Sequence, residues 1–222
     1  MSAKNKTKSW KYGYDPKHDL IIISKDGTLG EVYEIDNLTI GLPLESKSCF
    51  KRDSKKSQQY WERANIPVSL SKINSIFQWN DMPSDFKNKY VDYIEKEFDM
   101  REDGHWFMNN GKPTYITGGH YMYLQWASID IGYPDFREAN RLLYIFWEAC
   151  KADNRCFGMD YLKIRRSGFS FMSSSECVNT GTSAKNARIG ILSKTGSDSK
   201  KMFTDKVVPI NSRLPFFFKP IM

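Results

Sequence analysis

The sequence contains no long apolar stretch. None of the apolar runs among its 222 residues approaches the roughly 18 residues that a membrane-spanning helix needs. The first eight residues are polar and rich in lysine, so they lack the apolar core of a secretion signal. We therefore expect a soluble, intracellular protein without a membrane partner.

Potential metal ligands are few and scattered. The three histidines lie far apart, and no two of the four cysteines (Cys49, Cys150, Cys156 and Cys177) form a C-x-x-C pair. A zinc site is therefore not expected. We expect free thiols in a reducing cytosol. The carboxylates that end the segment 85–103 spread around a helix, as on a solvated face. The sequence shows no cluster of carboxylates of the kind that a metal-dependent nuclease needs.

Aromatic residues and positive charge are abundant. The 14 Phe, 12 Tyr and 6 Trp supply enough apolar surface for a core. The net charge of +7 is unevenly distributed, since residues 151–222 carry 13 basic and 5 acidic side chains. This part of the chain is where the phosphates of a nucleotide or of DNA would be met. The basic run at 185–206 also fits an ordinary solvated face.

Residues 1–57 are expected to form a small β unit between a polar tail and a charged linker. The segments 19–24 and 29–35 flank Asp26-Gly27, which is typical of a hairpin turn, and residues 38–42 could add a third strand. Residues 45–59 are dense in Lys and Ser and predict an exposed linker.

Residues 58–155 are expected to be mainly helical. Apolar spacing predicts short helices at 60–64 and 69–77, a long helix at 85–103 and an amphipathic helix at 136–153. Between the long helices, Asn110-Gly111 predicts a type I′ hairpin over residues 106–116. Gly118 and Gly119 then separate this hairpin from an aromatic segment at 120–126.

Residues 156–209 are expected to form a βαβα unit. The apolar run 157–164 predicts a strand buried on both faces, and a helix is expected to open near residue 170. After a turn at 179–183, residues 188–193 predict a second strand parallel to the first. A last helix is expected at 198–208, ended by Pro209.

The turn between the first of these strands and its helix has the chemistry of a phosphate cradle. Gly168 permits the tight turn, Ser170 can ligate Mg²⁺, and Lys163, Arg165 and Arg166 supply positive charge. Amide groups and the helix dipole both favour an anion at such a helix start. The strict pattern G-x-x-x-x-G-K-[ST] is not matched, because Lys163 and Phe169 stand at its first glycine and its lysine.

The stretch KIRRSGFS at residues 163–170 resembles the deviant phosphate-binding motif of the large terminase subunits of tailed bacteriophages, in which basic residues precede the glycine in a pattern like K-x-x-R-x-G-[YF]-S. The stretches ITGGHYMYLQW at 116–126 and GILSKTGSDSKKMF at 190–203 are similar to terminases of phages that infect gut Bacteroides, crAss-like phages included. The resemblance covers most of the chain.

The resemblance implies an α/β fold of the P-loop NTPase type, with a parallel sheet core that is incomplete in these residues. It implies an ATPase that uses ATP and Mg²⁺ to drive double-stranded DNA into a procapsid in the host cytoplasm. The implied partners are the portal protein, the small terminase subunit and further copies of the chain in a ring.

The resemblance also assigns roles to individual residues. Lys163 and Arg166 would neutralise the β- and γ-phosphates, and Arg165 would face a neighbouring subunit or DNA. The amides of residues 167–170, which include Ser167 and Phe169, would cradle the β-phosphate, with Ser170 on Mg²⁺. Upstream, Tyr121 and Gln125 would hold the adenine, although for any single residue of this aromatic cluster a place in an ordinary core is the more frequent outcome.

Two expectations limit this interpretation. The carboxylate pair that completes such a site, and the nuclease domain, lie in the family beyond a segment like the apolar end at 214–222. We therefore expect an N-terminal fragment that does not hydrolyse ATP efficiently alone. The alternative is a non-catalytic, basic α/β module that binds nucleic acid or a virion protein, with Arg165 and Arg166 on phosphodiesters.

Overall fold

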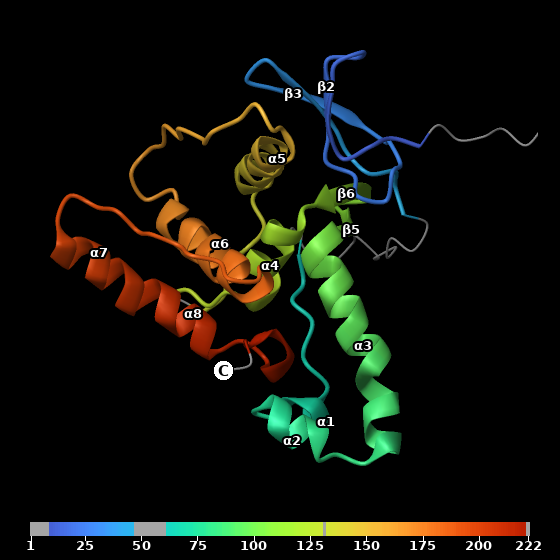
Figure 1. The fold of residues 1–222 in the computed structure, drawn as a ribbon, viewed down its shortest axis with the longest axis vertical. Helices are drawn as coiled ribbons and strands as arrows, with labels where there is room; N and C mark the ends of the chain where they lie inside the picture. The colour runs from blue at the N-terminus through green and yellow to red at the C-terminus, as the bar shows by residue number, and fades with distance from the viewer. Residues whose placement is uncertain (1–8, 47–60, 131, 221–222) are drawn as a thin grey trace, which may run out of the picture. The chain divides into compact units, whose positions relative to one another are not determined.

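The computed structural model describes residues 9–46, 61–130 and 132–220 (Figure 1). The chain divides into two compact units, each built from separate stretches of sequence. The first contains residues 1–60, 103–117 and 137–162, and the second contains residues 61–102, 118–136 and 163–222. The expected boundary at 57–58 and most of the expected linker at 45–59 lie outside the described residues.

The first unit contains a four-stranded mixed sheet. Its strands are β1 (Gly13–Asp15), β2 (Leu20–Ile22), β3 (Val32–Ile35) and β4 (Leu38–Gly41), in the order β1-β2-β4-β3. β2 runs parallel to β4 and antiparallel to β1. The fold is thus α/β, as expected, but this sheet lies at the start of the chain.

The prediction of a hairpin around Asp26-Gly27 is wrong. The segment at 19–24 supplies β2 and the segment at 29–35 supplies β3, but β4 lies between them in the sheet. The hairpin that does form joins β3 to β4 through Asp36 and Asn37, which both have positive φ (47° and 64°). Asp and Asn tolerate this conformation better than other non-glycine residues, so they can replace glycine in such a turn.

The hairpin predicted at 106–116 is confirmed. β5 (His105–Asn109) pairs with β6 (Lys112–Ile116), and the turn residues Asn110 and Gly111 have φ values of 51° and 80°. The predicted amphipathic helix is α5 (Glu138–Ala152). Its buried residues share one core with the sheet and this hairpin, made of Ile21, Ile23, Ile40, Leu42, Trp106, Tyr115, Ile145 and Ala149.

The second unit is helical. It begins with two short helices, α1 (Val68–Ser71) and α2 (Ile76–Asn80), in place of the single helix predicted at 69–77. The Ser75 hydroxyl starts the second one by accepting a hydrogen bond from the Gln78 amide. Residues 61–64, predicted to be helical, are irregular. The long helix is confirmed as α3 (Ser84–Asp103), and Gly118 and Gly119 open α4 (Gly118–Trp126).

The remaining helices of this unit follow the glycine turn. α6 (Phe169–Ser183) includes the segment 179–183 that was predicted to be a turn. After it, α7 (Gly196–Met202), the π-helix η1 (Phe203–Val207) and α8 (Val208–Ser212) form one continuous run. Pro209 lies inside this run and does not end it, because the preceding π-turn changes the hydrogen-bond pattern that a proline would otherwise break. A 3₁₀ turn, η2 (Phe216–Phe218), packs its aromatic rings in the core of this unit.

Neither strand of the predicted βαβα unit forms. Residues 157–164 and 188–193 have no strand partner among the described residues, and both stretches are irregular. Leu162 and Leu192 are 98% and 97% exposed, so the apolar run expected in a buried strand faces outward. A strand requires a hydrogen-bonded neighbour, and apolar sequence alone does not supply one.

None of the helices in the described parts of the chain is long and apolar enough to cross a membrane. Of the polar tail at residues 1–9, only residue 9 lies within the described part of the chain.

Candidate functional site

The glycine turn places the start of a long helix at the surface. Gly168 is the N-cap residue of α6, with φ 83° and ψ 0°, and has no side chain to cap the helix. The space around it is open, since a Cβ added there would meet no atom within 4 Å. The first amides of an α-helix have no acceptor within the helix, so this end of α6 favours an anion.

Ser170, the predicted magnesium ligand, lies at the surface in the first turn of α6, and the hydrogen bonds there use its carbonyl oxygen. The amides of Phe171 and Met172 donate to the Gly168 carbonyl over 3.0 and 3.3 Å. The hydroxyls of Ser173 and Ser174 donate to the Ser170 carbonyl, over 3.2 and 2.7 Å. Ser170 itself is exposed. Its hydroxyl is thus accessible to a ligand on the first turn of the helix.

The basic residues before the glycine are exposed and uncompensated. Within the described ranges, the side chains of Lys163, Arg165 and Arg166 make no hydrogen bond or ion pair. Arg166 has φ 69°, a left-handed conformation that tightens the turn. Of the other predicted contacts, Ser167 and Phe169 are half-buried. The eight residues from 163 to 170 therefore place three positive charges beside one helix start.

A further positive charge near this turn was not expected from the sequence. Lys206, on η1, places its ammonium group 3.8 Å from the centre of the Phe171 ring, in the first turn of α6. The sequence indicated only a solvated basic run at 185–206. The sequence could not predict the contact of Lys206 with Phe171, because it depends on the packing of η1 against α6.

The two predicted adenine contacts are bonded inside the protein. Tyr121 and Gln125 lie on α4, which packs against α6, and are 2% and 1% exposed. The Gln125 amide accepts a hydrogen bond from the Ala64 amide (3.1 Å) and donates one to the Ala64 carbonyl (2.7 Å). The Tyr121 hydroxyl donates to Glu97. These contacts are those of core residues, the interpretation that the sequence left open for this segment.

Glu97 is the buried acid that organises this helix. It is 3% exposed and accepts hydrogen bonds from the Tyr121 hydroxyl (2.5 Å) and the Trp126 indole (3.2 Å). Burial raises the pKa of Glu97, and the hydrogen bonds partly oppose that shift. The sequence placed this residue on a solvated acidic face, so its role was missed.

Arg101 secures the opposite end of α6. Its guanidinium donates to the Asn179 side-chain and backbone oxygens, both over 2.8 Å, and to the Thr182 hydroxyl. Burial lowers the pKa of Arg101 to about 10. A cation at the C-terminal end of a helix is favourable, and this one explains why residues 179–183 stay helical.

The residues around the turn could provide one protein ligand for magnesium. No group of three or more His, Cys, Asp or Glu side chains suited to a metal occurs in the described part of the chain. Mg²⁺ commonly keeps several waters and is bound by few protein groups together with phosphates. Ser170 fits that limited role, and a bound nucleotide would supply the phosphates.

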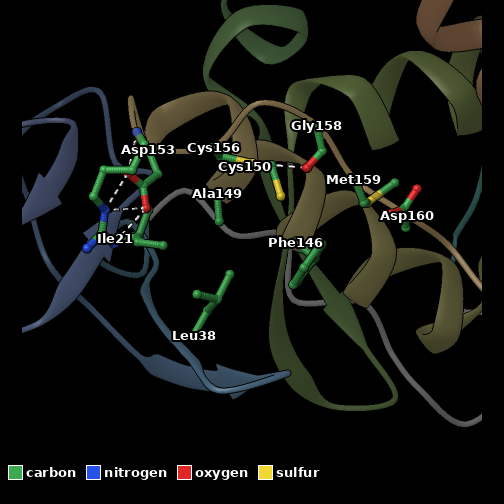
Figure 2. Close-up of a pocket in the computed structure, with 11 residues that line it drawn as sticks. Ile21, Leu38, Phe146, Ala149, Cys150, Asp153, Cys156, Gly158, Met159 and Asp160 are labelled. Atoms are coloured by element: carbon green, nitrogen blue, oxygen red, sulfur yellow. Dashed lines mark hydrogen bonds and ion pairs between the residues drawn. The ribbon is translucent and has the colours of Figure 1, made fainter.

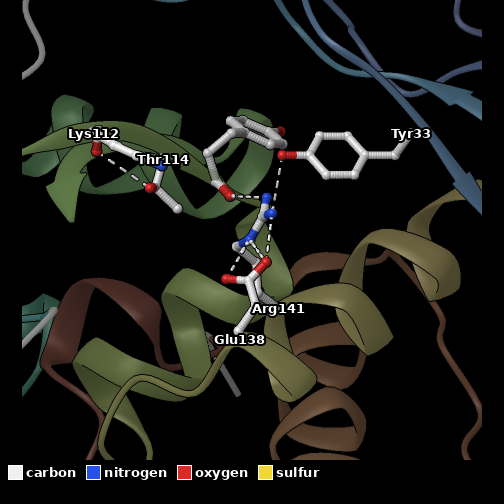
Figure 3. A network of polar contacts seen from close by, with 6 residues as sticks. Tyr33, Lys112, Thr114, Glu138 and Arg141 are labelled. Atoms are coloured by element: carbon white, nitrogen blue, oxygen red, sulfur yellow. Dashed lines mark hydrogen bonds and ion pairs between the residues drawn. The ribbon is translucent and has the colours of Figure 1, made fainter. Parts of the chain in front are cut away.

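The other prominent charged network belongs to the first unit and is fully bonded (Figure 3). Arg141 donates to Glu138 over 2.6 Å, to the Tyr33 hydroxyl over 3.2 Å and to the Tyr115 carbonyl over 3.3 Å. The guanidinium is buried between α5, β3 and β6. These contacts join the layers of the unit, which is a structural role.

Comparison of the chain with protein-family models, with curated proteins and with solved structures finds no match.

Proposed function

We propose that residues 163–170 and the start of α6 bind the triphosphate of ATP, as part of the large terminase subunit of a tailed bacteriophage. The observation that carries the proposal is the uncapped start of α6 at Gly168, beside exposed basic residues that have no protein partner among the described residues. The KIRRSGFS stretch supports it by its resemblance to the phosphate-binding motif of those ATPases.

In this proposal each group has a defined role. The amides at the start of α6 would surround the β-phosphate, Lys163 and Arg166 would neutralise the β- and γ-phosphates, and Ser170 would ligate Mg²⁺. Arg165 would contact DNA or a neighbouring subunit. The bound ion would offset the negative charge of the phosphates during hydrolysis.

These residues would bind ATP, and efficient hydrolysis would need further groups. A packaging ATPase also requires a carboxylate that orients the attacking water, and the turn itself contains none. Double-stranded DNA, the portal protein, the small subunit and a ring of identical subunits are the partners that the proposal implies, in the host cytoplasm.

Calorimetry with Mg·ATP tests the proposal. The unmodified chain should bind it, and the double variant Lys163→Ala, Ser170→Ala should lose at least tenfold in affinity, because it removes a charge and a metal ligand. Lys185→Ala is the matched control, since this exposed lysine follows the other end of α6 and should leave the affinity unchanged. Equal affinities for all three proteins, or no binding to any, would contradict the proposal.

A nucleic-acid-binding module without ATPase activity is the second candidate. Residues 163–222 contain 11 basic and 3 acidic side chains, and six of the basic residues that follow α6 are exposed: Lys185, Arg188, Lys194, Lys200, Lys201 and Arg213. Under this alternative, the chain would not bind Mg·ATP, so the Lys163 and Ser170 changes would have no ATP affinity to alter. The Lys163 change would instead weaken DNA binding for all sequences and reduce its salt dependence.

A further inference from the structure

Two cysteines of the first unit line the same pocket. The pocket has a volume of about 430 Å³ and is formed by the end of α5, the segment that follows it and the sheet (Figure 2). Cys150 lies in the last turn of α5 and Cys156 follows that helix by four residues. Both are half-buried free thiols. The sequence spacing, with five residues between them, gave no reason to pair them.

A tight turn after α5 brings the thiols together. The Asp153 amide donates to the Ala149 carbonyl over 2.9 Å, and the Cys156 amide donates to the Asp153 carbonyl over 3.0 Å. Arg155 holds the turn by donating to both Asp153 carboxylate oxygens, while its guanidinium lies 3.3 Å from the centre of the Tyr14 ring. The chain therefore reverses direction between the two cysteines.

Both cysteines belong to the lining of this pocket (Figure 2). The Cys156 thiol donates to the Gly158 carbonyl over 3.1 Å. Burial, together with the neighbouring thiol, raises the pKa of Cys150 to about 12. A raised pKa leaves little of Cys150 as thiolate, and thiolates, not thiols, attack disulfides.

We propose that Cys150 and Cys156 are a modification site, a dithiol that small-molecule disulfides such as oxidised glutathione convert reversibly to an intramolecular disulfide. The Cys156 thiolate attacks one sulfur of glutathione disulfide, forms a mixed disulfide and releases one glutathione thiolate. The Cys150 thiolate then attacks the Cys156 sulfur and releases the second. Two protein thiols are oxidised and one glutathione disulfide is reduced to two glutathiones, with no other reactant.

The disulfide would close a small ring at the end of α5. It would replace the hydrogen bond between Cys156 and the Gly158 carbonyl, and so alter the wall of the pocket that Gly158, Met159 and Asp160 complete. A thiol reagent would thus act on the pocket without touching residues 163–170, so the inference is independent of the proposed ATP site.

Peptide mapping of the folded chain tests the inference. After treatment with oxidised glutathione and blocking of remaining thiols, trypsin cuts after Arg141, Lys151, Arg155 and Lys163. The expected product is peptide 142–151 joined to peptide 156–163, which separates again when dithiothreitol is added. Cys177→Ser, which removes a thiol of the other unit, should leave the linked pair unchanged.

The remaining outcomes are also decisive. Cys150→Ser should hold glutathione on Cys156 as a stable mixed disulfide, because the second attack is removed. In the unmodified chain, separate glutathione adducts on both cysteines, links to Cys49, Cys177 or a second chain, or no reaction at either thiol would each overturn the inference.

Discussion

The Tyr121 hydroxyl donates a 2.5 Å hydrogen bond to the buried carboxylate of Glu97, which joins α4 to α3 within the second unit. Trp126 donates to the same carboxylate oxygen. Glu97 is therefore the acceptor for two buried donors, and it ties α4, which carries the predicted adenine contacts, to α3.

Glu97 should make stability depend on pH. Its pKa is raised in the folded state, so the protonated form favours folding below the unfolded value of about 4.3, and this contribution is lost as the pH rises through the folded pKa. Urea unfolding followed by tryptophan fluorescence should show unmodified protein losing stability relative to Glu97→Gln between pH 4 and pH 7. A difference that stays constant with pH would contradict this assignment.

Removing the acceptor altogether should cost more than neutralising it. In Glu97→Ala the Tyr121 hydroxyl and the Trp126 indole lose their acceptor while buried, and each unsatisfied donor costs about 1–3 kcal/mol. We expect Glu97→Ala to lower the free energy of unfolding by about 2 kcal/mol or more relative to Glu97→Gln at pH 7. Similar unfolding curves for the two variants would show that the donors find other partners.

Gln125→Ala should affect stability and leave nucleotide binding unchanged. The two hydrogen bonds to Ala64 contribute about 1 kcal/mol each, so the free energy of unfolding should fall by about 2 kcal/mol. Once folded, the variant should bind Mg·ATP and Mg·GTP with the affinities of the unmodified chain. A selective loss of ATP affinity would support the predicted role of Gln125 in adenine binding.

Gly168→Ala should disturb the turn through its backbone. A left-handed conformation at a residue with a Cβ costs about 1–2 kcal/mol, although the space beside Gly168 is open. We expect Mg·ATP affinity to fall about tenfold as the helix start shifts. Gly190→Ala is the control, because Gly190 also has open space but lacks positive φ, and its affinity should match that of the unmodified chain.

Lys206→Ala should weaken phosphate binding by threefold to tenfold, since one positive charge near the start of α6 is removed. The change should raise the dissociation constant for inorganic tripolyphosphate as much as that for ATP, because the charge acts on phosphates and not on the base. Lys201→Ala, which removes an exposed charge from α7, should have little effect. Equal effects of the two changes would show that only net charge matters.

Local sequence chemistry predicted the elements that depend on it. The hairpin at Asn110-Gly111 and the helices α3, α5 and α6 follow from turn residues and helical spacing, which neighbours in the chain determine. The glycine turn was also predicted, since only a glycine readily adopts the conformation of Gly168.

Elements that depend on distant partners were not predictable. β4 separates β2 from β3 in the sheet. Residues 179–183 stay helical because Arg101, which lies on α3, donates hydrogen bonds to this end of α6. The apolar run 157–164 was interpreted as a buried strand, yet its pairing depends on a neighbour that sequence pattern does not reveal. For the same reason the contact of Lys206 with Phe171 and the burial of Glu97 were missed.

The most direct test of the account is the response of individual backbone amides to Mg·ATP in a two-dimensional ¹H–¹⁵N NMR spectrum of the labelled chain. The largest shifts are expected at Ser167, Gly168, Phe169 and Ser170, because these amides would surround the β-phosphate. Small or absent shifts at those four residues, with larger shifts elsewhere or none at all, would contradict it.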